Sequence, residues 1–363
     1  MNLNLKIREK NFRRFIDKIP LRKNIINDLM VEIPLDNNFF NQLQINTINY
    51  LSESAQTEKN IKNEAELLSL LKNKKLRNMT PNGSVISKNV TSFEYNLLAK
   101  SYFKVIKSLK INSEIERIHF PFNIRIKYPQ VTEGNLTRFH PTEFMHSDGW
   151  TGASPNWVAI HIFLFGDVEN NNIRYAYPPS ELQESWLGPK LKSAEHQYIG
   201  KKFEIIDYTP KKGHLVLADN SVIHQSHREK NCGIRVSLDT GFDILNPELK
   251  KFYRNRNVSL NGVNVEEIRS KEEFDKNVIF GIGETSFFNF PDGFDDHPDN
   301  QSGFAHAARP KLINLVNRDE KVGVVKKLMS DIKSQLQRGL QMESKKSGII
   351  LNDLQRLIKK IRT

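Results

Sequence analysis

The chain has 363 residues, of which 38% are hydrophobic and 26% are charged, so it is long enough to bury a large core. Its single cysteine, Cys232, excludes an internal disulfide and favours a reducing compartment. The N-terminal segment lacks the apolar run of a signal peptide, and the most apolar run, residues 157–165, is too short to span a bilayer. We therefore expect a cytoplasmic protein with no membrane segment.

The formal net charge of +12 raises the question of a nucleic-acid partner, but much of the excess lies at one end. Residues 321–363 contain 11 Lys and Arg against 3 Asp and Glu, a net of +8. Within them Leu328, Ile332, Leu336 and Leu340 recur every four positions, which predicts an amphipathic helix. The positive charge is then the solvated face of C-terminal helices, and nucleic acid is not the expected partner.

Residues 1–115 are predicted to form a mainly helical region. Apolar residues between 12 and 19 follow the i, i+3, i+4, i+7 pattern of a helix that ends at Pro20. A Thr-x-x-Glu capping box at Thr91 and Glu94 marks the start of another helix.

Residues 116–245 are predicted instead to form strands. Residues 122–128 alternate apolar and polar, residues 157–165 are apolar on both faces, and residues 201–219 hold two strand-like runs joined by a Pro- and Gly-containing turn. Residues 233–244 are predicted to form one more strand. We predict an α+β fold with a jelly-roll core of the cupin-like kind over 116–245. Residues 246–363 should form an irregular loop followed by the basic C-terminal helices.

The residues that suggest chemistry are His146 and Asp148, separated by one position. Residues two apart in a strand point to the same face, so an imidazole and a carboxylate can converge on one ion. His224 follows a strand and a turn, and Arg235 comes 11 residues later. Two histidines and one carboxylate match the facial triad of non-haem iron(II) oxygenases. Arg235 supplies a fork suited to a carboxylate, and Ser237 shares its face.

This pattern, "HSD…H…RVS", resembles the iron(II)/2-oxoglutarate-dependent oxygenases, in particular the phytanoyl-CoA hydroxylase-like and antibiotic-biosynthesis branches that modify small molecules. The resemblance covers about residues 118–245 and implies a double-stranded β-helix. It implies that His146, Asp148 and His224 hold Fe(II), and that Arg235, assisted by Ser237, binds the distal carboxylate of 2-oxoglutarate. Tyr128 is a further cofactor-binding candidate. Dioxygen is then the co-substrate, and succinate and CO₂ are released.

Two positions refine the activity that the resemblance implies. Halogenating relatives have a small residue where this chain has Asp148, so hydroxylation is favoured. Relatives that repair nucleic acids carry an arginine six residues after the cofactor arginine, where this chain has Gly241. We therefore expect a dioxygenase that hydroxylates a small polar biosynthetic metabolite, either carbohydrate-like or derived from an amino acid.

Some assignments stay open at this point. His227 is a rival to His224 as the third ligand, and His161 is either a core histidine or a contact to cofactor or substrate. Candidate substrate contacts are polar or aromatic residues near strand ends: Trp150, Asn156, Arg174 and Arg125.

Two other functions remain as alternatives. The enzyme could hydroxylate a protein or RNA partner that docks on the basic C-terminal helices. The jelly roll could also be a non-oxidative metal isomerase or a binding module, which would have no need for an arginine placed to hold a dicarboxylate. The helical ends either brace the barrel or form a homodimer interface.

Overall fold

The computed structural model describes residues 3–245, with gaps at 75, 77, 81, 88–90, 120–121, 133–135, 137–140, 152 and 189–192, and three later strands. These strands are β12 (Gly262–Asn264), β13 (Val278–Thr285) and β14 (Ala308–Asn314), of which β13 and β14 pair with each other. The predicted basic C-terminal helices lie outside the described residues. Among the helices that are described, none has both the length and the apolar character needed to cross a bilayer.

Four helices come from the N-terminal region: α1 (Leu3–Asp17), α2 (Asn37–Ser54), α3 (Glu64–Asn73) and α4 (Ser92–Ser108). The predicted first helix is confirmed. Asp36 is the N-cap of α2, and its side chain accepts from two backbone N–H groups; Asn63 is the N-cap of α3 and accepts from one, that of Glu66. Helix α4 begins after Thr91 as predicted, but the threonine side chain makes no capping hydrogen bond.

The large sheet contains strands from both halves of the described chain. Its order is β1 (Asn24–Asn27), β2 (Met30–Pro34), β9 (His214–Asp219), β6 (Trp157–Gly166), β11 (Arg235–Ile244), β4 (Ile115–His119), β12. Strand β5 (Asn123–Lys127) also pairs with β11, and β3 (Ser84–Val85) pairs with β5. The expectation of a mainly helical region up to residue 115 did not include β1, β2 and β3. They are too short to show a clear period in the sequence, and their pairing partners are distant.

A second, smaller sheet has the order β10 (Ile223–Arg228), β7 (Asn171–Tyr177), β8 (Glu204–Ile205). Along the chain β6, β9 and β11 belong to the large sheet, whereas β7 and β10 belong to the small one. Every pairing within the two sheets is antiparallel. This alternation between two antiparallel sheets is the arrangement of a jelly roll, so the predicted α+β fold is confirmed.

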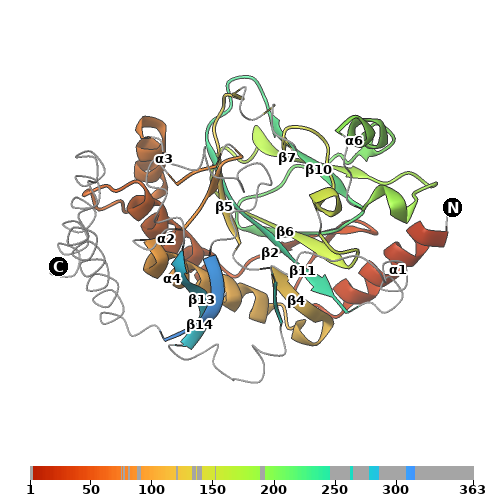
Figure 1. Ribbon diagram of the computed structural model, residues 1–363, viewed down its shortest axis with the longest axis horizontal. Helices are drawn as coiled ribbons and strands as arrows, with labels where there is room; N and C mark the ends of the chain where they lie inside the picture. Colours follow the sequence, from red (N-terminus) through yellow and green to blue (C-terminus); the bar gives the residue numbers. More distant parts are fainter. Residues whose placement is uncertain are drawn as a thin grey trace, which may run out of the picture.

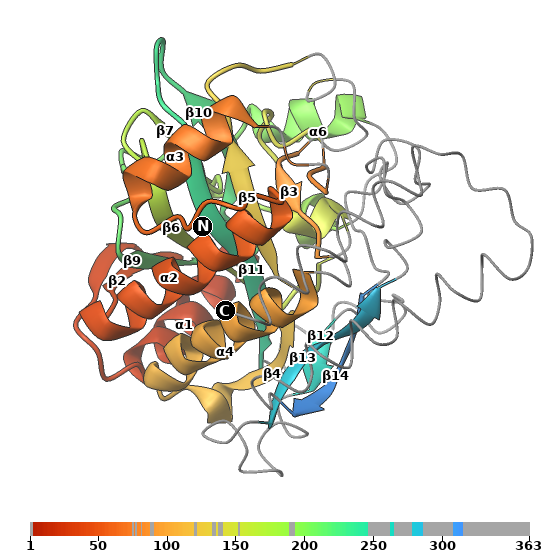
Figure 2. The same ribbon diagram turned by 90° about the vertical axis from the view of Figure 1, so that its left-hand side faces the viewer.

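The two faces of the large sheet differ in chemistry. Side chains on the outer face are apolar, for example Ile124, Ile160 and Leu238, and all three are fully buried. Helices α2, α3 and α4 lie together against this side (Figures 1 and 2). The inner face carries polar groups, because register pairs such as Arg235 with Lys127 place their side chains on the same face. The interior between the sheets is therefore lined by charged and polar residues.

Helix α1 is fastened to the barrel by a buried arginine. The Nε and Nη2 atoms of Arg8 donate to both carboxylate oxygens of Glu184, each over 2.7 Å, in the short helix η4 (Glu184–Trp186). Its Nη1 lies 2.9 Å from Asp219 at the end of β9. Since the Arg8 side chain is fully buried, this bidentate contact fixes the helix to the loop before β8.

Candidate metal centre

The two predicted histidine ligands lie on adjacent backbone segments. The N–H of His146 donates to the carbonyl oxygen of His224 over 2.9 Å, and the N–H of His224 donates back over the same distance. This antiparallel bridge sets the two imidazole rings beside each other, with centroids 4.5 Å apart. Strand β10 thus positions one ligand directly and the other through backbone pairing.

Asp148 completes the cluster from the first position of the short helix η3 (Asp148–Thr151). Its Oδ1 lies 3.9 Å from Nε2 of His224, and one ligand atom from each of His146, Asp148 and His224 lies within 4.8 Å of the others. Two imidazole nitrogens and one carboxylate oxygen at this separation fit a single divalent ion of the iron type with open positions. The structure therefore brings together the three residues that the sequence singled out.

Neighbouring groups orient the ligands. Nδ1 of His146 lies 2.8 Å from the carbonyl oxygen of Phe144, so this nitrogen carries the proton and Nε2 keeps its lone pair for a metal. The indole N–H of Trp157 donates to Oδ2 of Asp148 over 2.8 Å, which leaves Oδ1 facing His224. Gly241 lies against this indole, since a Cβ there would be 2.3 Å from the Trp157 ring. A side chain at position 241 therefore has no room unless both the Trp157 ring and the Val158 carbonyl oxygen, 2.6 Å from the same Cβ, shift.

The protonation states suit metal binding. Burial lowers the pKa of His146 and of His224 to about 4, so both imidazoles are neutral at pH 7. Burial raises the pKa of Asp148, but the facing imidazoles of His224 and His146 outweigh it and hold the pKa below its usual value. The cluster thus offers two neutral nitrogens and one anionic oxygen at neutral pH.

Arg235, the first residue of β11, has a fully buried side chain. All three of its guanidinium nitrogens lack a hydrogen-bond partner among the described residues. The ring of Phe163 lies beneath the guanidinium, 5.5 Å from centroid to Cζ. Burial lowers the pKa of Arg235 to about 10, so it is still charged at pH 7. A buried cation with five unused N–H donors fits a carboxylate-bearing ligand.

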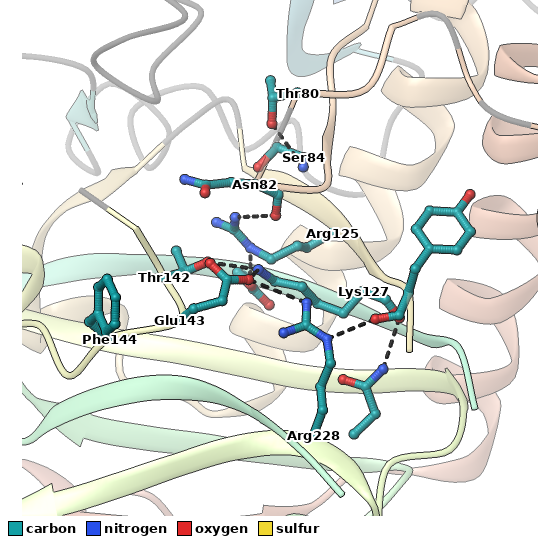
Figure 3. A network of polar contacts seen from close by, with 12 residues as sticks. Thr80, Asn82, Ser84, Arg125, Lys127, Thr142, Glu143, Phe144 and Arg228 are labelled. Atoms are coloured by element: carbon teal, nitrogen blue, oxygen red, sulfur yellow. Dashed lines mark hydrogen bonds and ion pairs between the residues drawn. The ribbon is translucent and has the colours of Figure 1, made fainter. Parts of the chain in front are cut away.

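Two other predicted residues share the inner face with Arg235. The Ser237 hydroxyl donates to Oδ1 of Asp239 over 2.8 Å. Arg125 forms an ion pair with the other oxygen of the same carboxylate at 2.5 Å, and its Nη1 donates to the backbone carbonyl of Asn82. Arg125, Ser237 and Asp239 therefore form one polar group beside the candidate metal centre (Figure 3 labels Arg125 and Asn82).

Trp150 and Asn156 lie close to the segment that carries Asp148. Trp150 is buried and its indole N–H donates to the carbonyl oxygen of Trp186 over 2.6 Å. Asn156 is buried, and its backbone N–H donates to the Ser154 hydroxyl before β6 begins. A role for either side chain in substrate binding stays a prediction.

The structure does not bring Tyr128 and Arg174 to the site. The Tyr128 hydroxyl donates to the carbonyl oxygen of Leu71 on α3, on the side of the outer helices. The hydroxyl of Tyr175 lies against His161 inside the barrel. Because successive side chains of a strand point to opposite faces, the adjacent Arg174 points outward, where it forms an exposed ion pair with Glu229.

The same period decides between the rival histidines. His227 is three positions after His224 on β10, hence on the opposite face, where Nε2 lies 2.6 Å from Glu229. His161 is buried, bonded to the Tyr175 hydroxyl over 3.0 Å, with its ring 5.1 Å from that of His224. It is therefore buried and hydrogen-bonded beside the candidate metal centre, and a contact of His161 to cofactor or substrate stays a prediction.

Sequence reasoning missed the residues that hold the ligands. Trp157 could have been found, because it lies four positions before His161 on a strand and so shares its inner face. The carbonyl of Phe144 gives no sequence signal. The sequence also gives no signal for the ion pair between Arg125 and Asp239, because these residues are 114 positions apart.

Comparison with known proteins gives structural similarity only. No family model and no curated protein matches the chain. Among solved structures, it is similar to the non-haem α-ketoglutarate-dependent carbocyclase SnoK from nogalamycin biosynthesis, with 12% identity, a TM-score of 0.40, and 64% of this chain and 83% of that chain covered. It is also similar to EctD from S. alaskensis with bound Fe, with 16% identity, a TM-score of 0.35, and 59% and 72% covered.

A third similar structure is a novel N-substituted L-amino acid dioxygenase from Burkholderia ambifaria AMMD, with 11% identity, a TM-score of 0.32, and 66% and 91% of the two chains covered. Identities and TM-scores this low leave the activity of this chain to be inferred from its own residues.

Proposed function

We propose that this protein is an Fe(II)- and 2-oxoglutarate-dependent oxygenase that hydroxylates a small polar metabolite. The observation that carries the proposal is a pair of features on one barrel interior: a His146, Asp148, His224 cluster that fits one divalent ion, and a buried Arg235 guanidinium with no hydrogen-bond partner among the described residues. A metal site alone would suit an isomerase or a binding module. The buried arginine would in addition bind one carboxylate of a dicarboxylic acid.

Each residue has a defined task in this scheme. His146, Asp148 and His224 would hold Fe(II) on one side and leave the opposite side open. Arg235 would hold the distal carboxylate of 2-oxoglutarate by two parallel N–H···O bonds. When bound, the iron would activate dioxygen, the oxidant, while 2-oxoglutarate would be oxidised to succinate and CO₂ and the substrate would be hydroxylated.

The residues around the centre keep it in place and select the substrate. The Phe144 carbonyl orients the His146 ring and the Trp157 indole orients the Asp148 carboxylate before the metal binds. Ser237, Arg125 and Asp239 give the inner wall a polar surface. Such a wall favours a polar substrate, carbohydrate-like or amino-acid-derived, over a fatty chain, because its buried charges would lose solvation against hydrocarbon.

An anaerobic titration tests the cofactor assignment. Fe(II) and 2-oxoglutarate added to the metal-free protein should produce a weak visible charge-transfer band. We expect the band to disappear in His146→Ala and in His224→Ala, and to weaken in Arg235→Ala. His227→Ala is the matched control on the same strand and should keep the band, since His227 lies on the outer face.

If the folded wild-type protein gives no band, the proposal is wrong, and a binding module becomes the better explanation. If the band forms, succinate release with panels of sugars and N-substituted or free amino acids should identify the substrate class.

A further inference from the structure

A buried ion cluster lies just before the first metal-ligand candidate in the chain. Oε1 of Glu143 is 2.9 Å from Nζ of Lys127 and 3.3 Å from Nη2 of Arg228. The three side chains are exposed by only 6%, 1% and 8%, in that order. Lys127 also donates to the hydroxyl of Thr142 over 2.7 Å. Figure 3 shows the four side chains converging from three separate segments.

The segments that this cluster joins are those that build the candidate metal centre. Lys127 ends β5, directly opposite Arg235 in the register. Arg228 ends β10, the strand that carries His224, and its Nε donates to the carbonyl oxygen of Tyr128 over 2.7 Å. Glu143 stands three residues before His146. The cluster therefore ties the His146 segment to both neighbouring strands at once.

Backbone bonds show how closely this segment follows β10. The N–H of Ser226 donates to the carbonyl oxygen of Thr142 over 2.7 Å, and His146 and His224 exchange two bonds further along. The carbonyl oxygen that fixes the His146 ring belongs to Phe144, between these two attachment points. The position of that carbonyl depends on the residues on either side being held, and the Glu143 side chain holds one side.

The charges in the cluster are unequal. Two basic side chains share one carboxylate, and burial lowers the pKa of Lys127 to about 7 although Glu143 opposes the shift. Buried ionic groups of this kind stabilise poorly compared with apolar side chains of similar size. The cluster instead fixes geometry, because each of its bonds holds the segment that carries Glu143 in place relative to β5 or β10.

We propose that Glu143, held by Lys127 and Arg228, is a positioning residue for the metal-binding histidine His146. The inference rests on the proposed function, because it assigns a role toward that same metal. It predicts that metal affinity depends on a carboxylate that is not a ligand. Residues that orient metal ligands typically contribute about 10- to 100-fold to affinity.

The test uses Co(II) as the probe, with the metal-free full-length protein under anaerobic conditions. The dissociation constant and the visible ligand-field absorption of Co(II) are measured for the wild type and for Glu143→Gln, and thermal unfolding is followed in parallel. We expect Glu143→Gln to weaken Co(II) binding by about 10-fold or more and to change the absorption, which reports ligand geometry.

Two further variants separate positioning from general destabilisation. Lys127→Met leaves one carboxylate facing one arginine, so it should weaken Co(II) binding less than Glu143→Gln does. The double variant should recover part of the affinity lost in Glu143→Gln, because it removes a buried amine left without its carboxylate partner. Glu229→Gln is the control: this carboxylate is exposed, contacts Arg174 and His227 outside the barrel, and should leave the dissociation constant unchanged.

The outcomes are distinguishable. If the wild-type protein binds no Co(II), both the proposed metal site and this inference are wrong. Wild-type binding that is matched in affinity and spectrum by folded Glu143→Gln overturns the positioning role and leaves the proposed function intact. If Glu143→Gln does not fold, Lys127→Met decides: affinity equal to that of the wild type would refute the role.

Discussion

Replacing Arg235 by methionine should make the metal-free protein more stable, which is unusual for a fully buried side chain. Burial lowers the pKa of Arg235 to about 10, which corresponds to about 3 kcal/mol of unfavourable free energy for burying it charged. This cost is present wherever the group is protonated in both states, so it applies at pH 7. The variant also loses a contact with Phe163 and repacks imperfectly, each worth about 1 kcal/mol. The net expectation is a gain of about 1 kcal/mol.

Arg125→Met is the matched comparison on the same inner face. Its guanidinium already has a partner, the Asp239 carboxylate at 2.5 Å, and both side chains are slightly exposed. Removing the arginine leaves that carboxylate without its ion pair and should cost about 2–3 kcal/mol, somewhat less than for a fully buried pair. Two neighbouring arginines should therefore respond to the same substitution with opposite signs.

Urea unfolding of both variants and the wild type, with and without 2-oxoglutarate and a redox-inert divalent metal, measures these changes. The ligands should stabilise the wild type by mass action and stabilise Arg235→Met much less. The reasoning is refuted if Arg235→Met is as destabilised as Arg125→Met, or if it gains as much stability from 2-oxoglutarate as the wild type does.

Three further predictions concern other parts of the described chain. Burial raises the pKa of Asp239, but the Arg125 cation outweighs burial and lowers this pKa to about 2. About 2 kcal/mol of folding stability should therefore be lost as the pH falls from roughly 4 to 2. Acid unfolding of Asp239→Asn should lack this pH dependence. Gly241→Ala should shift the Trp157 indole and the Val158 carbonyl, disturb the hydrogen bond from the indole to Asp148, and weaken Co(II) binding about 10-fold, as measured by titration. Arg8→Met removes the cation that contacts two buried carboxylates and should cost about 3–5 kcal/mol in urea unfolding, whereas Arg13→Met, from an exposed ion pair, should cost less than about 1 kcal/mol.

Local patterns in the sequence were sufficient to predict several strands and to select the three residues of the candidate metal centre. The run at 157–165 is apolar on both faces, and the strand it predicted, β6, is buried on both faces. His146 and Asp148 were selected because one-residue spacing lets two side chains converge, and His224 because of its distance from Arg235. These inferences need only the period of a strand and the coordination preferences of an ion.

Other features depend on which strands become neighbours. The alternation at 122–128 predicted a strand, yet an alternating strand ordinarily turns its polar side to solvent. Here the polar side, with Arg125 and Lys127, faces the barrel interior, because β5 pairs with β11 and the outer helices cover the apolar side. The failures of Tyr128 and Arg174 to join the site have the same origin, since a shift of one residue moves a side chain to the other face.

The sequence by itself therefore determined the chemical types in the site: two imidazoles, a carboxylate and an arginine in an order suited to a metal and a dicarboxylate. Only the tertiary structure decided which groups are satisfied. Arg125 meets Asp239 across 114 residues, whereas Arg235 is left without a hydrogen-bond partner among the described residues. Partners so distant along the chain are chosen by strand pairing and sheet packing, and neither can be read from local periodicity.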